Sequence, residues 1–230
     1  VRPAVDAYRV STNHEDNEVA IDTMGEMISN KALELSFESI PGCVLQTTVW
    51  LLTPEKAGTY ALVSIGISCL TTGFASAMIA FDMDIDVANR KNDPKFFGYI
   101  PNDNSLRGRC FVLMTLMSAM HNLSRCTGYA LLATSGIDNL VLIFAGGEIG
   151  LYLLLKIIRG DYYCWIPLNG FQAKAFALLY RVCVKMIVDF TGCINFRHPY
   201  ELGGFVYTIS LLWAQAFPFV ALQYFDGEMK

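Results

Sequence analysis

The chain has 230 residues, of which 53% are hydrophobic and only 17% are charged. This composition excludes a disordered chain, which needs low hydrophobicity and a high net charge. The formal net charge is −4, and no basic stripe lies outside the apolar runs, so binding to nucleic acid is not expected. Seven cysteines without a CxxC pair indicate neither a disulfide framework nor a zinc site, and no cofactor is expected.

Residues 1–32 form a polar, acidic N-terminal segment that is predicted to be helical. Apolar residues recur there at roughly helical spacing between Val19 and Ile28. One interpretation is an amphipathic helix that lies on a membrane surface, and the other is a solvated helix that leads into the first apolar run. The second is favoured because an acidic helix is not attracted to anionic lipid.

Residues 33–224 contain six apolar runs near the length of about 20 residues that a helix needs to cross a bilayer. In chain order they are 33–53, 57–81, 107–134, 137–158, 171–196 and 203–224. The alternative, a soluble all-α bundle, would give its surface helices a polar face. The sequence therefore predicts an all-α, polytopic integral membrane helix bundle, with a short tail at 225–230. We expect six spans, or five if the first run is re-entrant.

The distribution of Lys and Arg predicts the orientation of this bundle. If all six runs cross, twelve of these residues lie on the side of the termini and of loops 82–106 and 159–172, against two on the other side. If the first run does not cross, the ratio is nine to five, and the same side still holds the excess of positive residues. Because positively charged loops stay in the cytoplasm, loops 82–106 and 159–172 are predicted to be cytoplasmic. The sequence does not indicate which membrane holds the protein.

Polar and ionisable side chains inside the apolar runs are the main functional signal. Each unpaired charge at this depth costs roughly 2.5–3.5 kcal/mol. The predicted network consists of Glu38 and Gln46 in the first run, His121 and Arg125 in the third, Glu148 and Tyr152 in the fourth, and Arg181, Lys185 and Asp189 in the fifth. Within the third, fourth and fifth runs, successive members of the network are four positions apart, so they share a helix face. Three positive and three negative charges balance, which predicts pairing in the bundle interior.

Two interpretations of this network stay open. The charges could only specify which helix packs against which, or they could line a polar path for ions, protons or lipid headgroups. The GxxxG formed by Gly146 and Gly150 predicts close helix packing beside Glu148. No metal site is expected, because the Asp82-x-Asp84-x-Asp86 pattern lacks the later ligands of a calcium loop. Catalytic motifs are also absent, so no catalytic residue and no enzyme are predicted.

Pro41 lies in the first run and cannot donate a hydrogen bond to the carbonyl of Phe37. We therefore expect a kink at Pro41 and a small polar notch that contains Glu38 and Ser39. The candidate partners for Glu38 are Arg125, Arg181 and Lys185. The alternative is a kinked helix whose glutamate simply pairs internally.

The segment around this proline resembles the Glu-Ser-x-Pro-Gln-x-x-Leu-Gln segment of the XK-related membrane proteins. The matching residues are Glu38, Ser39, Pro41, Leu45 and Gln46, whereas Gly42 replaces the usual Gln. The resemblance implies a helix embedded in the bilayer beside buried charges, and phospholipid scrambling as in some members of that family. The rest of the chain resembles a group of uncharacterised multi-pass algal membrane proteins, through residues 97–101, 188–192 and 197–204.

Three functions are compatible with these features. The first is phospholipid scrambling or lipid handling, by resemblance to the XK-related proteins. The second is an ion or proton channel or a transporter, and the third is a non-catalytic membrane scaffold whose charges only specify helix packing. Membrane lipids are the expected partners in each case, with a protein partner or a homo-oligomer as a further option.

Overall fold

The computed structural model describes residues 23–92, 94, 97–135, 139–158 and 170–192, together with Leu212, Ala216, Pro218 and Gln223. The secondary-structure elements of these ranges are all helical, which confirms the all-α prediction. Four predicted segments lie wholly or mostly outside the described residues. They are the acidic N-terminal segment, loop 159–172, the sixth apolar run and the tail at 225–230. Pro218 of the sixth run is described, and it packs against Gly128.

One long helix opens the described chain. It consists of α2 (Thr23–Glu34), the π-helix η1 (Leu35–Ser39) and α3 (Ile40–Leu52), which follow one another without a break. The helix thus begins inside the acidic segment and continues through the first apolar run. The expected boundary at residue 32 falls within α2.

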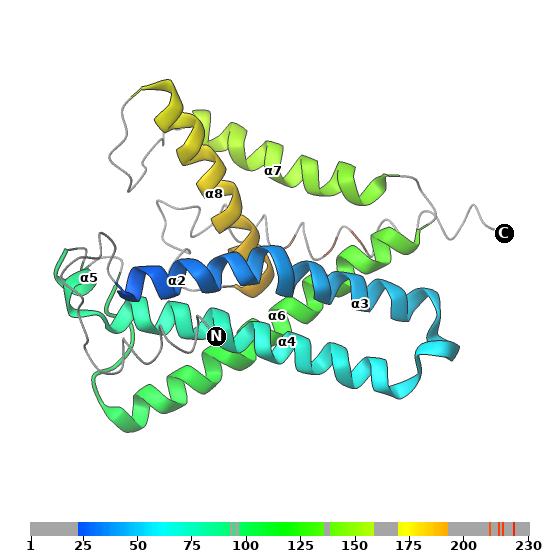
Figure 1. The fold of residues 1–230 in the computed structure, drawn as a ribbon, viewed down its shortest axis with the longest axis horizontal. Helices are drawn as coiled ribbons and strands as arrows, with labels where there is room; N and C mark the ends of the chain where they lie inside the picture. The colour runs from blue at the N-terminus through cyan, green and yellow to red at the C-terminus, as the bar shows by residue number, and fades with distance from the viewer. Residues whose placement is uncertain are drawn as a thin grey trace.

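The remaining helices are α4 (Pro54–Ile85), α5 (Val87–Asn92), α6 (Asn104–Thr134), α7 (Leu140–Ile158) and α8 (Phe171–Thr191). Figure 1 shows the helix α2–η1–α3 beside α4, with α6 crossing both. In the same view α7 lies above α3. α8 runs obliquely from near the left end of α7 down toward η1. The most extensive packing is that of α4 against α6, followed by that of α3 against α6. α6 is therefore the central helix of the described bundle.

A glycine permits a close approach between α4 and α6. A Cβ atom added to Gly73 would lie 2.6 Å from the backbone nitrogen of Ala119, closer than real Cβ contacts allow. In the GxxxG of α7, by contrast, a Cβ added to Gly146 or Gly150 would meet no atom within 4 Å among the described residues. The prediction of close packing at that motif therefore finds no partner among the described helices and stays a prediction.

The irregularity expected at Pro41 takes the form of a π-helix. Immediately before the proline, the amide N–H of Ile40 donates to the carbonyl of Leu35, five residues back. Pro41 itself lies in the first turn of α3 and is exposed. Because its ring would clash with the carbonyl of Phe37 in a regular helix, a locally wider turn relieves the conflict. Single π turns of this kind occur frequently at functional sites.

Within the described residues, α4 is the one helix long and apolar enough to cross a membrane. The apolar stretch of α7, Leu140–Leu155, is shorter. Several charged residues interrupt α6 and α8: Arg107, Arg109 and Arg125 in the first, and Lys174, Arg181, Lys185 and Asp189 in the second. By length and composition, the structure thus supports one membrane-spanning helix.

Candidate functional site

Arg125 of α6 and Glu148 of α7 form an ion pair in the interior. The two side chains are 2% and 8% exposed. Arg125 Nη2 donates to Glu148 Oε2 at 2.9 Å, and Nη1 donates to Oε1 at 3.3 Å. The hydroxyl of Tyr129, one turn after Arg125, also donates to Oε2 at 2.9 Å. This bidentate geometry, with a third donor, holds the carboxylate in one orientation.

A second ion pair lies on α8, where Lys185 donates to Asp189 Oδ2. The two residues are four positions apart, so they meet on one helix face. Lys185 Nζ lies 5.4 Å from the ring centroid of Tyr152 on α7. His121 Nε2 lies 2.7 Å from the backbone carbonyl oxygen of Asp189. These contacts join α8 to α6 and α7 around the same interior region.

Aromatic rings enclose the buried guanidinium. The Cζ atom of Arg125 lies 5.3 Å from the ring centroid of Tyr129 and also 5.3 Å from that of Phe190. The two ring centroids are 5.2 Å apart. A cation is stabilised by aromatic faces at this distance, so the rings add to the stabilisation that Glu148 provides.

Both ion pairs line one cavity of about 350 Å³ where α3, α6, α7 and α8 meet. Its lining contains Ile40, Pro41, Val44, Leu45 and Thr48 from α3, Arg125 and Tyr129 from α6, Ala145, Glu148 and Ile149 from α7, and Lys185, Met186, Asp189 and Phe190 from α8. The contribution of α3 is almost entirely apolar, whereas the charged groups come from the other three helices. The surface of the cavity is therefore mostly apolar, with paired charged groups in its wall.

One polar atom in this region has no partner in the part of the chain that the structure describes. Arg125 Nε is buried and has no hydrogen bond among the described residues, although both terminal nitrogens of the guanidinium are bonded to Glu148. A buried N–H without an acceptor costs about 1–3 kcal/mol.

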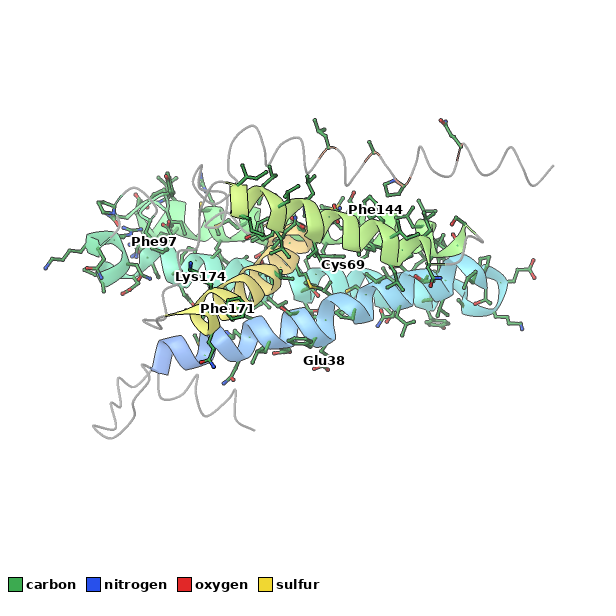
Figure 2. The ribbon with its side chains drawn as sticks, turned by 90° about the horizontal axis from the view of Figure 1, so that it is seen from above. Glu38, Cys69, Phe97, Phe144, Phe171 and Lys174 are labelled. Carbon is green, nitrogen blue, oxygen red and sulfur yellow. The ribbon has the colours of Figure 1, made fainter. Side chains whose placement is uncertain are left out.

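The structure brings together most of the residues predicted from sequence, but two of them lie outside the cluster. Glu38 is exposed, and Figure 2 shows it on the outer side of its helix, away from α7 and α8. Its position two residues before the buried Ile40 turns it roughly 200° away from the interior. The expectation that Glu38 pairs with Arg125 or Lys185 is therefore wrong, since both have other partners.

Gln46 is also exposed, and its Oε1 accepts a hydrogen bond from Ser68 Oγ at 3.2 Å. It thus joins α3 to α4 rather than lining the cavity. The side chain of Arg181 lies outside the described part of the structure, so its predicted place in the network stays a prediction.

Tyr129 and Phe190 are site residues that the sequence analysis missed. A signal for Tyr129 was present, because it lies four residues after Arg125 and hence on the same face of α6. Phe190 directly follows Asp189, and its ring stacks with Tyr129 only because α8 packs on α6. That contact has no local sequence signal.

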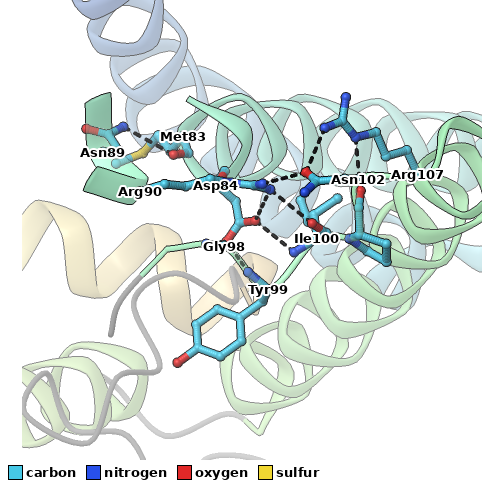
Figure 3. Close-up of polar contacts among 10 residues, drawn as sticks. Met83, Asp84, Asn89, Arg90, Gly98, Tyr99, Ile100, Asn102 and Arg107 are labelled. Carbon is cyan, nitrogen blue, oxygen red and sulfur yellow. Dashed lines mark hydrogen bonds and ion pairs between the residues drawn. The ribbon is translucent and has the colours of Figure 1, made fainter. Parts of the chain in front are cut away.

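A separate polar cluster lies at the carboxyl end of α4, around Asp84, whose side chain is 2% exposed. Figure 3 shows its carboxylate accepting from three consecutive backbone N–H groups. Oδ1 accepts from Gly98 at 3.0 Å and Tyr99 at 3.2 Å, and Oδ2 accepts from Ile100 at 2.8 Å. Arg90 adds an ion pair at 3.5 Å. Asp84 therefore anchors residues 98–100 to α4.

The predicted loop 82–106 contains regular structure at both ends. Its first residues continue α4, residues 87–92 form α5, and Asp103 caps the start of α6 by accepting from Ser105 and Leu106 N–H groups. Among the described residues there is no cluster of His, Cys, Asp or Glu that could hold a metal ion. Asp84 instead satisfies backbone donors.

Comparison of the chain with models of protein families, with curated proteins and with solved structures gives no match.

Proposed function

We propose that this protein is a multi-pass membrane protein that binds phospholipid in the cavity between α3, α6, α7 and α8 and moves it between the two leaflets. The observation that carries the proposal is the shared location of two buried ion pairs and an apolar wall in a single cavity of about 350 Å³. A phospholipid has the same division, since its headgroup is charged and its acyl chains are apolar.

The outer surface supports a membrane environment for this cavity. Large apolar side chains are exposed along several helices, including Val63 and Ile67 on α4, Leu113 on α6, and Leu142 and Leu151 on α7. Lipid is the simplest environment that would cover all of these side chains. The resemblance of residues 35–46 to the XK-related proteins adds support from the sequence.

The proposed orientation follows the distribution of positive charge. Lys31, Arg90 and Arg107 lie near one end of the bundle, where α2 and α6 begin and α4 ends, whereas Lys56 lies at the other end. Positively charged ends favour the cytoplasm. We therefore place loops 82–106 and 159–172 on the cytoplasmic side.

Reconstitution of the full chain into liposomes tests the proposal. We expect fluorescent phosphatidylcholine in the inner leaflet to become accessible to an impermeant quencher faster than in protein-free liposomes. Glu148→Gln should slow this exchange, because it leaves Arg125 with a weaker partner at the cavity wall. The matched control is Glu38→Gln, which changes an exposed carboxylate outside the cavity and should leave the rate unchanged.

Other results would support the alternative functions. If lipid does not exchange but the liposomes pass ions or protons, and neutralising Glu148 or Asp189 alters the current, the protein is a conductor. If Glu148→Gln lowers stability and no flux of lipid or ions is found, the ion pairs serve packing alone. Either result contradicts lipid scrambling.

A further inference from the structure

We infer that the cavity selects lipids with a zwitterionic headgroup, carrying both a phosphate and an ammonium, over lipids with a net negative headgroup. The inference rests on the proposed function, because it takes the cavity to be a lipid site. It adds a substrate class, which the charges of the lining residues determine.

The described lining residues carry balanced charge. Arg125 and Lys185 are positive, and Glu148 and Asp189 are negative, so the sum is zero. Both pairs are closed within the protein, and the side chains of Arg125, Glu148 and Lys185 are at most 8% exposed. An anionic headgroup would therefore add a buried charge without a counter-charge, which is strongly unfavourable. A zwitterionic headgroup adds no net charge.

The cavity also offers partners for both halves of a zwitterion. Arg125 lines the cavity, and a phosphate oxygen is a strong acceptor for the N–H groups of a guanidinium. Asp189 lines the same cavity, and its carboxylate, which accepts from Lys185 at Oδ2, can attract an ammonium. The rings of Tyr129 and Phe190 line the same cavity, and aromatic faces attract alkylated ammonium groups.

The apolar wall distinguishes a lipid from a free headgroup. Ile40, Val44 and Leu45 of α3 line the cavity together with Ile149 of α7. These side chains offer nothing to a water-soluble zwitterion, but they can bury the glycerol backbone and the start of an acyl chain. We therefore expect the lipid to bind and the isolated headgroup to bind far more weakly.

The test is a competition experiment on the purified full chain in detergent micelles. Bound fluorescent phosphatidylcholine is displaced with unlabelled phosphatidylcholine, with phosphatidic acid of the same chains, or with glycerophosphocholine. We expect phosphatidic acid to compete at least about tenfold less well than phosphatidylcholine, because it leaves an uncompensated buried charge. Glycerophosphocholine should not compete.

Charge substitution supplies the decisive comparison. Glu148→Gln and Asp189→Asn each give the lining a net positive charge, so each should strengthen binding of phosphatidic acid relative to phosphatidylcholine by about tenfold. Two variants on different helices guard against the failure of one to fold. Glu38→Gln lies outside the cavity and should keep the selectivity of the unaltered chain. A packing role alone would weaken all lipids equally.

The outcomes separate this inference from the proposed function. Equal competition by both lipids in the unaltered chain, or unchanged selectivity in both charge variants, overturns the inference while lipid movement in liposomes still supports the proposed function. Selective binding without lipid movement supports the inference and contradicts scrambling. Competition by glycerophosphocholine as strong as that by phosphatidylcholine overturns the lipid assignment of the site.

Discussion

At the scale of single residues, the ion pair of Arg125 and Glu148 is the most consequential contact of the interior. Removal of one partner leaves a buried charge without compensation. We expect Arg125→Met to lower the free energy of unfolding by about 3–5 kcal/mol, measured by chemical or thermal unfolding in detergent.

The double variant Arg125→Met/Glu148→Leu should lose less stability than Arg125→Met alone, because no unpaired charge remains. Lys56→Met removes an exposed charge and serves as a control, with an expected change within about 0.5 kcal/mol. If the single and double variants lose the same free energy of unfolding, the unpaired charge of Glu148 is not what destabilises Arg125→Met.

Asp84 gives a second prediction at the same scale. In Asp84→Asn the amide NH₂ can no longer accept from all three N–H groups of residues 98–100. We expect a loss of about 1–3 kcal/mol and faster hydrogen exchange of these three amides. Asp103→Asn is the matched control, because asparagine is as good a helix N-cap as aspartate. Unchanged exchange in Asp84→Asn would show that the carboxylate does not hold the loop.

At the scale of elements, the contact between α4 and α6 depends on Gly73. A Cβ there would lie 2.6 Å from Ala119 N and 2.8 Å from Ala119 Cα, and backbone atoms cannot move aside cheaply. We expect Gly73→Ala to destabilise the protein by about 1–3 kcal/mol through overpacking. Gly66→Ala, on the same helix, meets no atom within 4 Å among the described residues.

The Gly66→Ala control should therefore be neutral or stabilise the chain by up to about 1 kcal/mol, since alanine has the higher helix propensity. The two variants differ only in their surroundings, so thermal unfolding of both in the same detergent isolates the contact. A Gly73→Ala variant as stable as Gly66→Ala would contradict the close approach of α4 and α6.

At the scale of the whole molecule, α4 is the helix from which the topology in the membrane can be tested. The backbone of Gly58 is not helical, so α4 bends there, and the continuous helix after it, residues 59–85, extends about 40 Å. This length exceeds the bilayer core of about 30 Å. Lys56 lies near its start, and Tyr99, which is 68% exposed, is anchored through Asp84 to its end. If α4 crosses, these two positions lie on opposite sides of the membrane.

Cysteine substitution tests this topology. In intact cells, Lys56→Cys should react with a membrane-impermeant maleimide, and Tyr99→Cys should react only after permeabilisation, each measured above the labelling of the unsubstituted chain. Labelling of both positions in intact cells would contradict a membrane-spanning α4. The reverse pattern would contradict the orientation inferred from the positive charges.

The local regularities of this protein were predictable from sequence. Long apolar runs predicted helices, and helices occupy the five runs that the structure largely describes. A spacing of four residues predicted that Lys185 and Asp189 share a face of α8, where they form an ion pair. The proline rule predicted an irregularity near Pro41, and a π-helix directly precedes this proline.

The amino-acid sequence by itself determined the helical class and which side chains share each helix face, because both depend on residues a few positions apart. The tertiary structure alone decided which faces meet. In the folded chain Glu38 faces outward, Arg125 pairs with Glu148, and Asp84 accepts from N–H groups 14–16 residues away. Those outcomes depend on how each helix is rotated about its axis when it packs, and no local spacing encodes that rotation.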